Sequence, residues 1–255
     1  MQLFGDKIAS RAAEAGFESL LDYYYYLRYD AAAVTELDAL ADALVVDETY
    51  FFRELDALRA GVEQVVLPAV AKRGKARIWS VACATGEEPL SIAMLLEEAG
   101  IAKSCRITAT DISARALAGA REGVYGARSL RVLSPNPPPR GLSKRAAAIA
   151  DAAIVRDGSK ARVVRRLVDT IDYRQLNLLD EAAISAMGTF DLVFCRNVLI
   201  YFADETVKRV TSSLATALGP EGRLIIGASE SLLRFGTVLR CEERGGAFLY
   251  ARETR

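Results

Sequence analysis

The chain has 255 residues, of which 51% are hydrophobic and 26% charged, and its 33 Lys and Arg balance its 33 Asp and Glu. This composition is that of one large globular domain, or of one with a small companion, and a zero net charge gives no general attraction to nucleic acid. The sequence contains no histidine, which excludes the commonest general base, the commonest zinc ligand and every nucleophile activated by imidazole.

The sequence also gives no signal for a membrane or for an oxidising compartment. No run approaches 18 apolar residues, and Met1–Arg11 lacks the basic and then apolar order of a signal peptide. We therefore expect a cytoplasmic protein without membrane insertion. The four cysteines are widely spaced within apolar stretches, which favours reduced core residues over disulfides, redox chemistry or a metal site; they are Cys83, Cys105, Cys195 and Cys241.

The first 60 residues have the pattern of a small helical domain. Ser19 with Asp22, and Thr35 with Asp38, are helix-capping signals. Apolar residues after the second signal recur at the spacing of one helix face. The run Tyr23–Tyr26 follows the first signal; we expect simple core packing, with packing of some rings on a neighbouring domain as the alternative.

From residue 75 the pattern changes to short apolar runs separated by amphipathic helices. Arg77–Cys83 and Arg106–Thr110 are expected to be buried strands. Between them Pro89 suits a first helical position and Gly100 a helix stop. These segments predict one strand–helix–strand unit.

The same alternation continues toward the C-terminus. We expect a strand at Phe190–Cys195, a helix at Asp204–Leu218 ending at Gly219–Pro220, and a strand at Arg223–Ile226. Gly245–Gly246 then joins two strand-like runs as a hairpin. Residues 61–255 are therefore predicted to form a doubly wound α/β sheet with an antiparallel C-terminal hairpin.

An insertion interrupts this domain over about residues 126–172. Ser134–Pro139 holds four of the chain's seven prolines and can neither continue a helix nor enter a central strand. Between Arg140 and Arg174 there are nine Lys or Arg and four Asp. This local positive charge could steer the insertion toward an acidic partner, and a solvated surface loop is the alternative.

Ligands of doubly wound sheets bind at the carboxyl ends of the strands, and two acidic segments lie there. Ala82–Pro89 contains one glycine, so it is not a phosphate cradle; its Glu87 and Glu88 could receive a ligand's ammonium group, or only stabilise the helix dipole. Asp111 ends the next strand, where a carboxylate accepts both hydroxyls of a ribose. An ordinary turn is the alternative for Asp111.

The third segment follows the strand at Phe190–Cys195. Arg196, Asn197 and Tyr201 stand where a transferred group would lie. The alternative is that Tyr201 is a wall of the core and Arg196 a surface charge.

Four segments together resemble the chemotaxis-receptor methyltransferase family, CheR: Thr49–Glu54 (TYFFRE), Trp79–Pro89 (WSVACATGEEP), Gly123–Tyr125 (GVY) and Cys195–Phe202 (CRNVLIYF). The resemblance covers roughly residues 20–250. It implies a Rossmann-like class I methyltransferase domain at residues 61–255, a helical domain at 1–60 and a docking subdomain in the insertion. It further implies S-adenosylmethionine (SAM) as cofactor, S-adenosylhomocysteine (SAH) as product, and glutamates of chemoreceptors as methyl acceptors.

The resemblance also implies roles for single residues. Thr49 and Arg53 would close over the cofactor from the helical domain, together with Asp47, which stands where the family usually has Asn. Glu87 would lie near the methionine part and Asp111 at the ribose.

The remaining implied contacts come from the later strands. Asn177 and Leu178 would lie beside the adenine, and Arg196 and Asn197 would form a turn that faces the cofactor. Tyr201 would lie beside the transferred methyl group.

The acceptor chemistry agrees with the absence of histidine. A glutamate side chain, with an ordinary pKa of about 4.3, is ionised at neutral pH and needs no general base to act as a nucleophile. We expect Arg53 and Tyr201 to orient this carboxylate.

The expected partner is the cytoplasmic helical region of chemoreceptors, with a monomeric enzyme. Fewer than 50 residues precede Thr49, so we expect a shortened helical domain in which the early basic helix of the family is missing or degenerate. Two other functions remain open: methylation of another protein or of a small acid, and binding of SAM or SAH by a non-catalytic sensing module.

Overall fold

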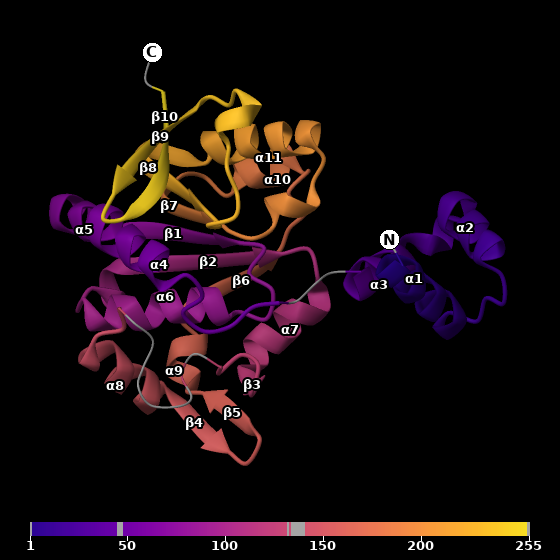
Figure 1. Cartoon of the computed structure of the whole chain (residues 1–255), viewed down its shortest axis with the longest axis horizontal. Coiled ribbons are helices and arrows are strands. Elements are labelled where there is room, and N and C mark those ends of the chain that lie inside the picture. The colour runs from indigo at the N-terminus through magenta and orange to yellow at the C-terminus, as the bar shows by residue number, and fades with distance from the viewer. Residues whose placement is uncertain (1, 45–47, 132, 134–140, 254–255) are drawn as a thin grey trace.

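The fold is built on one twisted sheet with helices on both faces (Figure 1). The computed structural model describes residues 2–44, 48–131, 133 and 141–253. Within these residues, seven strands pair in the order β6-β2-β1-β7-β8-β10-β9. The first five are parallel, and β10 runs antiparallel to β8 and to β9. The predicted doubly wound α/β sheet and its C-terminal hairpin are confirmed.

The strands of this sheet are short and mostly buried. They are β1 (Ala76–Val81), β2 (Cys105–Asp111), β6 (Ile171–Gln175), β7 (Phe190–Cys195), β8 (Leu218–Ile226), β9 (Leu239–Arg244) and β10 (Ala247–Arg252). Because β1 and β7 pair although more than 100 residues separate them, the strand order reverses between them. Ligand sites of such sheets lie at this reversal.

Helices flank the sheet and precede it. They are α1 (Gln2–Glu14), α2 (Leu20–Tyr29), α3 (Val34–Leu44), α4 (Leu55–Gly61), α5 (Leu67–Arg73), α6 (Glu87–Glu98), α7 (Ala114–Glu122), α8 (Lys144–Ala153), α9 (Arg165–Val168), α10 (Glu181–Ala186) and α11 (Asp204–Thr216). A π-helical turn, Val62–Val66, joins α4 to α5, and 3-10 turns occupy Ala31–Ala33, Ala102–Ser104, Leu199–Tyr201 and Leu233–Phe235. None of the described helices has the length and apolar character needed to cross a bilayer.

Two hydrophobic clusters of described residues hold helices on the two faces of the sheet. One contains side chains of α4, α5, α6 and α7, such as Leu58 and Met94. The other contains side chains of α10 and α11, such as Ile184 and Leu214. Fully buried aliphatic side chains of this size each contribute about 1.5–3 kcal/mol of transfer free energy. Packing of helices on both faces therefore stabilises the sheet and fixes the positions of its strand ends.

Three of the predicted helix boundaries are wrong. Helix α6 begins at Glu87, so Pro89 is its third residue and not its first. Helix α3 begins at Val34, and Thr35 does not cap it. The chain enters α3 through the 3-10 turn Ala31–Ala33, which Asp30 caps: its Oδ1 accepts a hydrogen bond from the N–H of Ala32 at 2.8 Å. The helix predicted to run from Asp204 to Leu218 ends at Thr216, and β8 begins at Leu218. Gly219–Pro220 therefore lies inside the strand and does not stop the helix.

The N-terminal helices pack on one another and lie beside α7, on one side of the sheet (Figure 1). Ser19 caps α2, as predicted, by accepting hydrogen bonds from two main-chain N–H groups. Tyr23 is buried, and its hydroxyl donates to Glu36 at 2.7 Å. Tyr24 and Tyr25 are 49% and 51% exposed, so the expected core packing holds for one ring of the run and not for these two.

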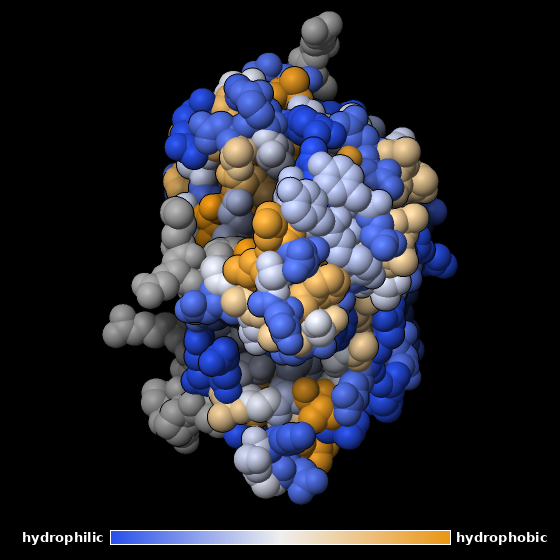
Figure 2. Space-filling model, turned by 90° about the vertical axis from the view of Figure 1, so that its right-hand side faces the viewer, coloured by the Kyte–Doolittle hydropathy of each residue, from blue (hydrophilic) through white to orange (hydrophobic). Residues whose placement is uncertain are grey.

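The outward face of these helices is rich in aromatic and apolar side chains. Figure 2 shows pale and orange side chains gathered there between charged ones. The exposed large hydrophobic residues of this region are Leu20, Leu21, Tyr24, Tyr25, Tyr29, Val34 and Leu37.

A small sheet lies below the main one (Figure 1). In the described part of the chain, β3 (Val124–Gly126), β4 (Ile154–Asp157) and β5 (Lys160–Val163) pair in the order β3-β5-β4. Buried alanines of α8, such as Ala146 and Ala150, belong to the same hydrophobic cluster as α6. The segment expected to be inserted thus shares a core with the main domain; its proline-rich part, Ser134–Pro139, falls outside the described residues.

Candidate active site

A cavity of about 460 Å³ opens at the carboxyl ends of β1, β2 and β7, where the strand order reverses. The segment after β6 and one helix of the N-terminal region, α3, complete its walls. Its lining residues are Ala41, Leu44, Ala82, Ala84, Thr110, Asp111, Ile112, Leu176, Asn177, Leu178, Leu179, Asn197, Val198, Tyr201 and Phe202. The cavity has mostly apolar walls with a few polar groups, as small-molecule sites do.

Asp111 is the buried acid of this cavity. It ends β2, and only 5% of its surface is exposed. Its two carboxylate oxygens accept hydrogen bonds from the main-chain N–H groups of Ala84 at 2.8 Å and Ser113 at 2.9 Å. Burial raises the pKa of Asp111, and the N–H donors of Ser113 and Ala84 offset part of that effect. An acceptor held in this way suits the hydroxyls of a bound sugar.

The turn between β1 and α6 forms the neighbouring wall. Glu87 begins α6 and is 1% exposed, and its carboxylate accepts a hydrogen bond from the hydroxyl of Thr85 at 2.7 Å. The hydroxyl of Tyr125 donates to the carbonyl of Thr85 at 2.8 Å. Glu87 is therefore buried beside the turn and is not among the residues that line the cavity.

The segment after β6 contributes the predicted pair at 177 and 178. Asn177 is exposed, and its Oδ1 accepts a hydrogen bond from the N–H of Leu179 at 2.9 Å. Leu178 is 9% exposed. Both residues line the cavity, with an amide and an aliphatic side chain on the same wall.

The turn after β7 brings two further predicted residues to the cavity. Asn197 has a φ of 59° in the left-handed region. Its Nδ2 donates to Glu54 at 3.1 Å. Tyr201 lines the cavity and is 56% exposed, so this end of the cavity faces solvent.

Arg196 does not line the cavity, although the sequence suggested a residue facing the cofactor. Its side chain is 1% exposed and lies between two acids, 2.8 Å from Glu88 and 3.1 Å from Glu54. It also donates to the main-chain carbonyl of Arg53. Burial alone would raise the pKa of Glu54, but the charge of Arg196 and the hydrogen bonds from Asn197 and a main-chain N–H lower it.

The segment Thr49–Glu54 lies beside the cavity. Neither Thr49 nor Arg53 is among its lining residues, and Asp47 falls outside the described residues. The main-chain N–H of Phe52 donates to Ser91 of α6 at 2.9 Å, which fixes the segment to the domain. Arg53 donates to the carbonyl of Glu48, and its guanidinium carbon lies 5.8 Å from the centre of the Tyr50 ring.

Backbone strain gathers around this site. Of the described residues, five that are not glycine have a positive φ between 47° and 59°. Three of them line the cavity, and two belong to the segment beside it: Phe52, Glu54, Ala82, Ala84 and Asn197. Each such residue costs on the order of 1–3 kcal/mol and persists where the surroundings hold it, typically at functional sites.

Comparison with known proteins agrees with this geometry. The family model "CheR methyltransferase, SAM binding domain" matches residues 47–245. The chain belongs to this family. A chemotaxis protein methyltransferase 2 of Vibrio cholerae is 35% identical over 87% of this chain and 74% of its own length. A chemotaxis protein methyltransferase 1 of Pseudomonas aeruginosa is 31% identical over 90% and 82%. A probable biofilm formation methyltransferase WspC of Pseudomonas putida is 34% identical over 96% of this chain, which spans 55% of that relative.

The protein is thus a SAM-dependent methyltransferase of the CheR family, and the cavity fits its cofactor chemically. SAM carries a nucleoside without phosphates and a positive charge. The β1–α6 turn has one glycine, Gly86, and so lacks the glycine-rich cradle of a phosphate site. Asp111 offers an acceptor for ribose hydroxyls, and Asn177 and Leu178 offer an amide and an apolar wall for a base.

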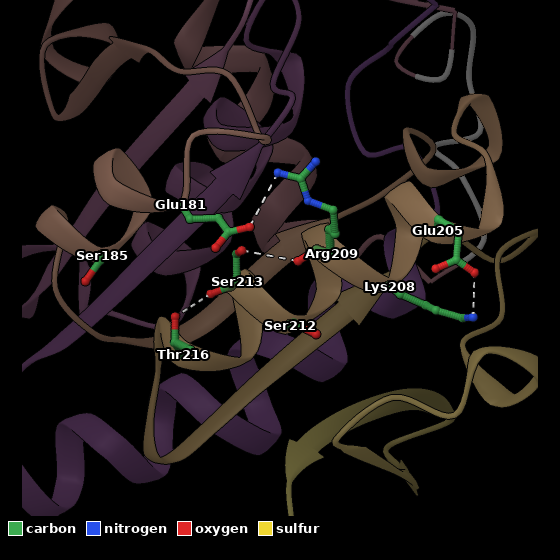
Figure 3. Close-up of a pocket in the computed structure, with 8 residues that line it drawn as sticks. All are labelled: Glu181, Ser185, Glu205, Lys208, Arg209, Ser212, Ser213 and Thr216. Carbon is green, nitrogen blue, oxygen red and sulfur yellow. Dashed lines mark hydrogen bonds and ion pairs between the residues drawn. The ribbon is translucent and has the colours of Figure 1, made fainter.

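A second hollow, between α10 and α11, lacks these features (Figure 3). It measures about 510 Å³, and charged and hydroxyl side chains line it. Arg209 pairs with Glu181 at 3.5 Å and Lys208 with Glu205 at 2.8 Å, all largely exposed. The cavity at the strand ends is therefore the candidate active site of this CheR-family chain.

Sequence reasoning missed two acids at this site, Glu54 and Glu230. Glu54 ends the Thr49–Glu54 segment, so the sequence marked its position but did not show that it pairs with Arg196. Glu230 lies after β8 and accepts hydrogen bonds from main-chain N–H groups of the turn after β7. A carboxylate three residues after a glycine at the end of a strand was the available signal.

Proposed function

We propose that this chain uses SAM to methylate glutamate side chains in the cytoplasmic helical region of chemoreceptors, in chemotaxis or a related chemosensory pathway. The observation that carries the proposal is Tyr201, which lines the cofactor cavity of a CheR-family chain and is 56% exposed. An acceptor side chain can reach that end from solvent. The names of the Vibrio and Pseudomonas chemotaxis methyltransferases support the pathway, and a cytoplasmic location belongs to the same proposal.

In this proposal different cavity residues contact different parts of the cofactor. Asp111 accepts the ribose hydroxyls, Asn177 and Leu178 hold the adenine, and Asn197 lies toward the methyl group. SAM, when bound, supplies an electrophilic methyl group on a positively charged sulfur. Glu87 is buried and does not line the cavity, and its carboxylate accepts a hydrogen bond from Thr85 of the turn that would face the methionine part.

The acceptor carboxylate needs orientation and not deprotonation. Since it is ionised at neutral pH, a chain without histidine can carry out the transfer. The protein's part is to align the reactants and exclude water, which is worth effective molarities on the order of 10⁵ M or more. We propose that the Tyr201 hydroxyl and the Arg53 guanidinium hold the carboxylate; among the described residues, no carboxylate forms an ion pair with Arg53.

Calorimetric titration with SAH, followed by transfer of labelled methyl from SAM to cytoplasmic receptor fragments, tests the proposal. Binding of SAH together with base-labile label on the receptor is expected, because carboxyl methyl esters hydrolyse in base. Binding of SAH without any label on receptor fragments would reject the receptor as acceptor and favour another acceptor or a sensing role.

Replacing Tyr201 by Phe tests the role of the hydroxyl. We expect the turnover number to fall about tenfold, the effect of losing one hydrogen bond of roughly 1.4 kcal/mol in the transition state. The affinity for SAH should change little. Tyr29→Phe, on the exposed face of α2, is the matched control, and an unchanged turnover number in Tyr201→Phe would contradict the assigned role.

A further inference from the structure

The carboxylate of Glu230 accepts hydrogen bonds from main-chain N–H groups of the turn after β7. Its Oε2 accepts hydrogen bonds from the main-chain N–H groups of Gly227 at 2.7 Å and Asn197 at 2.8 Å. Its Oε1 accepts from those of Leu199 at 2.7 Å and Ile200 at 3.3 Å. Three of these four donors belong to the turn that ends in Tyr201.

These hydrogen bonds fix the turn in an uncommon backbone conformation. Asn197 has a left-handed φ of 59°, a region that few residues with a side chain occupy and that asparagine tolerates better than most. Bonds from N–H groups to a charged carboxylate are shorter and about twice as strong as neutral ones. Tyr201 follows Ile200 directly, so the carboxylate of Glu230 sets where the Tyr201 side chain begins.

A second set of contacts shows how closely the loop after β8 packs against the turn after β7. Glu54 accepts hydrogen bonds from the Asn197 side chain at 3.1 Å and from the N–H of Ala228 at 3.0 Å. A Cβ on Gly227 would lie 2.7 Å from Nδ2 of Asn197 and 2.8 Å from Oε2 of Glu230. The loop after β8 can therefore approach the turn after β7 only with glycine at position 227.

We propose that Glu230 is a positioning residue for methyl transfer, which holds Asn197 and Tyr201 at the acceptor end of the cofactor cavity. Glu230 is not among the lining residues, so it acts through the turn. The inference rests on the proposed function for the identity of the acceptor. The cofactor contacts expected from Asp111, at the end of β2, and Asn177, after β6, come from other parts of the chain and do not depend on Glu230.

Glu230→Gln is the direct test, because the amide keeps the shape and replaces one acceptor oxygen by a donor. One pair of main-chain N–H groups then faces an NH₂ group and loses its acceptor. We expect faster amide hydrogen exchange in the peptide spanning residues 197–202. We also expect a turnover number at least tenfold lower, with the dissociation constant of SAH within about threefold of the wild-type value.

Gly227→Ala tests the same contacts from the other side, and Glu243→Gln is the control. The added methyl group would push Asn197 and Glu230 apart, so the same faster exchange and lower turnover number are expected. Glu243 is exposed on β9, and its replacement should leave exchange and turnover unchanged. All variants are compared below their unfolding temperatures.

The outcomes separate positioning from general stability. Unchanged exchange at 197–202 in Glu230→Gln overturns the proposal, as does an unchanged turnover number. A turnover number and an SAH affinity that fall together, with a lowered melting temperature, also overturn it, because they indicate a structural role only. If the wild-type chain transfers no methyl to receptor fragments, the proposed acceptor fails, and the exchange at 197–202 alone then supports or overturns the role of Glu230.

Discussion

Replacing Arg196 by Met decides whether this residue stabilises the fold or binds the cofactor. The sequence favoured a contact with the cofactor, whereas the structure buries the guanidinium between Glu54 and Glu88. The side chains of these acids are 24% and 14% exposed. Removing one partner of a buried ion pair costs about 3–5 kcal/mol, because the remaining charge stays buried without compensation.

The lower end of this range applies to Arg196→Met. Glu54 keeps hydrogen bonds from Asn197 and Ala228, and Glu88 keeps one from Ser80. A loss of about 3 kcal/mol corresponds to a melting temperature lowered by roughly 6–12 °C in a chain of this size. The affinity of the still folded variant for SAH should change little.

The assay is urea unfolding of Arg196→Met, Glu88→Gln and the double variant, with SAH titration of each. The double variant should be less destabilised than the sum of the single ones, with a coupling of about 1–3 kcal/mol. Arg209→Met, which removes the exposed pair with Glu181 (Figure 3), is the control and should cost less than about 1 kcal/mol. If Arg196→Met unfolds like this control and loses SAH affinity, Arg196 binds the cofactor and does not stabilise the fold.

Two further predictions concern buried hydroxyls and acid stability. The hydroxyl of Tyr173 is buried without a hydrogen-bond partner among the described residues, whereas that of Tyr125 donates to a carbonyl. By urea unfolding, Tyr173→Phe should leave stability unchanged or raised and Tyr125→Phe should lower it by about 1 kcal/mol; the reverse order would contradict the assignment. The lowered pKa of Glu54 means that its contribution to stability is complete above the ordinary pKa of a glutamate and is lost as the pH falls through the folded-state pKa. The difference in stability between wild type and Glu54→Gln should therefore shrink as the pH is lowered below the ordinary glutamate pKa, and a constant difference would exclude this linkage.

The sequence predicted the features that depend on local chemistry. The cap at Ser19 and the strand Phe190–Cys195 are set by neighbouring residues, and both are found as expected. Asp111 lines the cavity because an acid at the end of a parallel strand must lie at that edge.

Features that join distant parts of the chain could not be predicted in this way. Arg196 meets Glu88 across 108 positions and the carbonyl of Arg53 across 143, and no local pattern states which charges will pair. The same holds for Glu230, whose acceptor role exists only once the loops after β7 and β8 lie together. The direction of the Arg196 side chain follows from these contacts, so the sequence could not predict that this side chain lies outside the cavity.

The left-handed residues around the cavity limit how this protein could be engineered for greater thermal stability. Glycine at Ala82 or Ala84 would relieve strain of roughly 1–2 kcal/mol, yet it would also give the unfolded chain more conformational freedom, worth about 0.5–1 kcal/mol. The net gain would be small, and the substitution would loosen the wall of the cavity that the β1–α6 turn forms. A designer would do better on the exposed surface of α11, where a side chain such as Ser212 can be changed without touching the site.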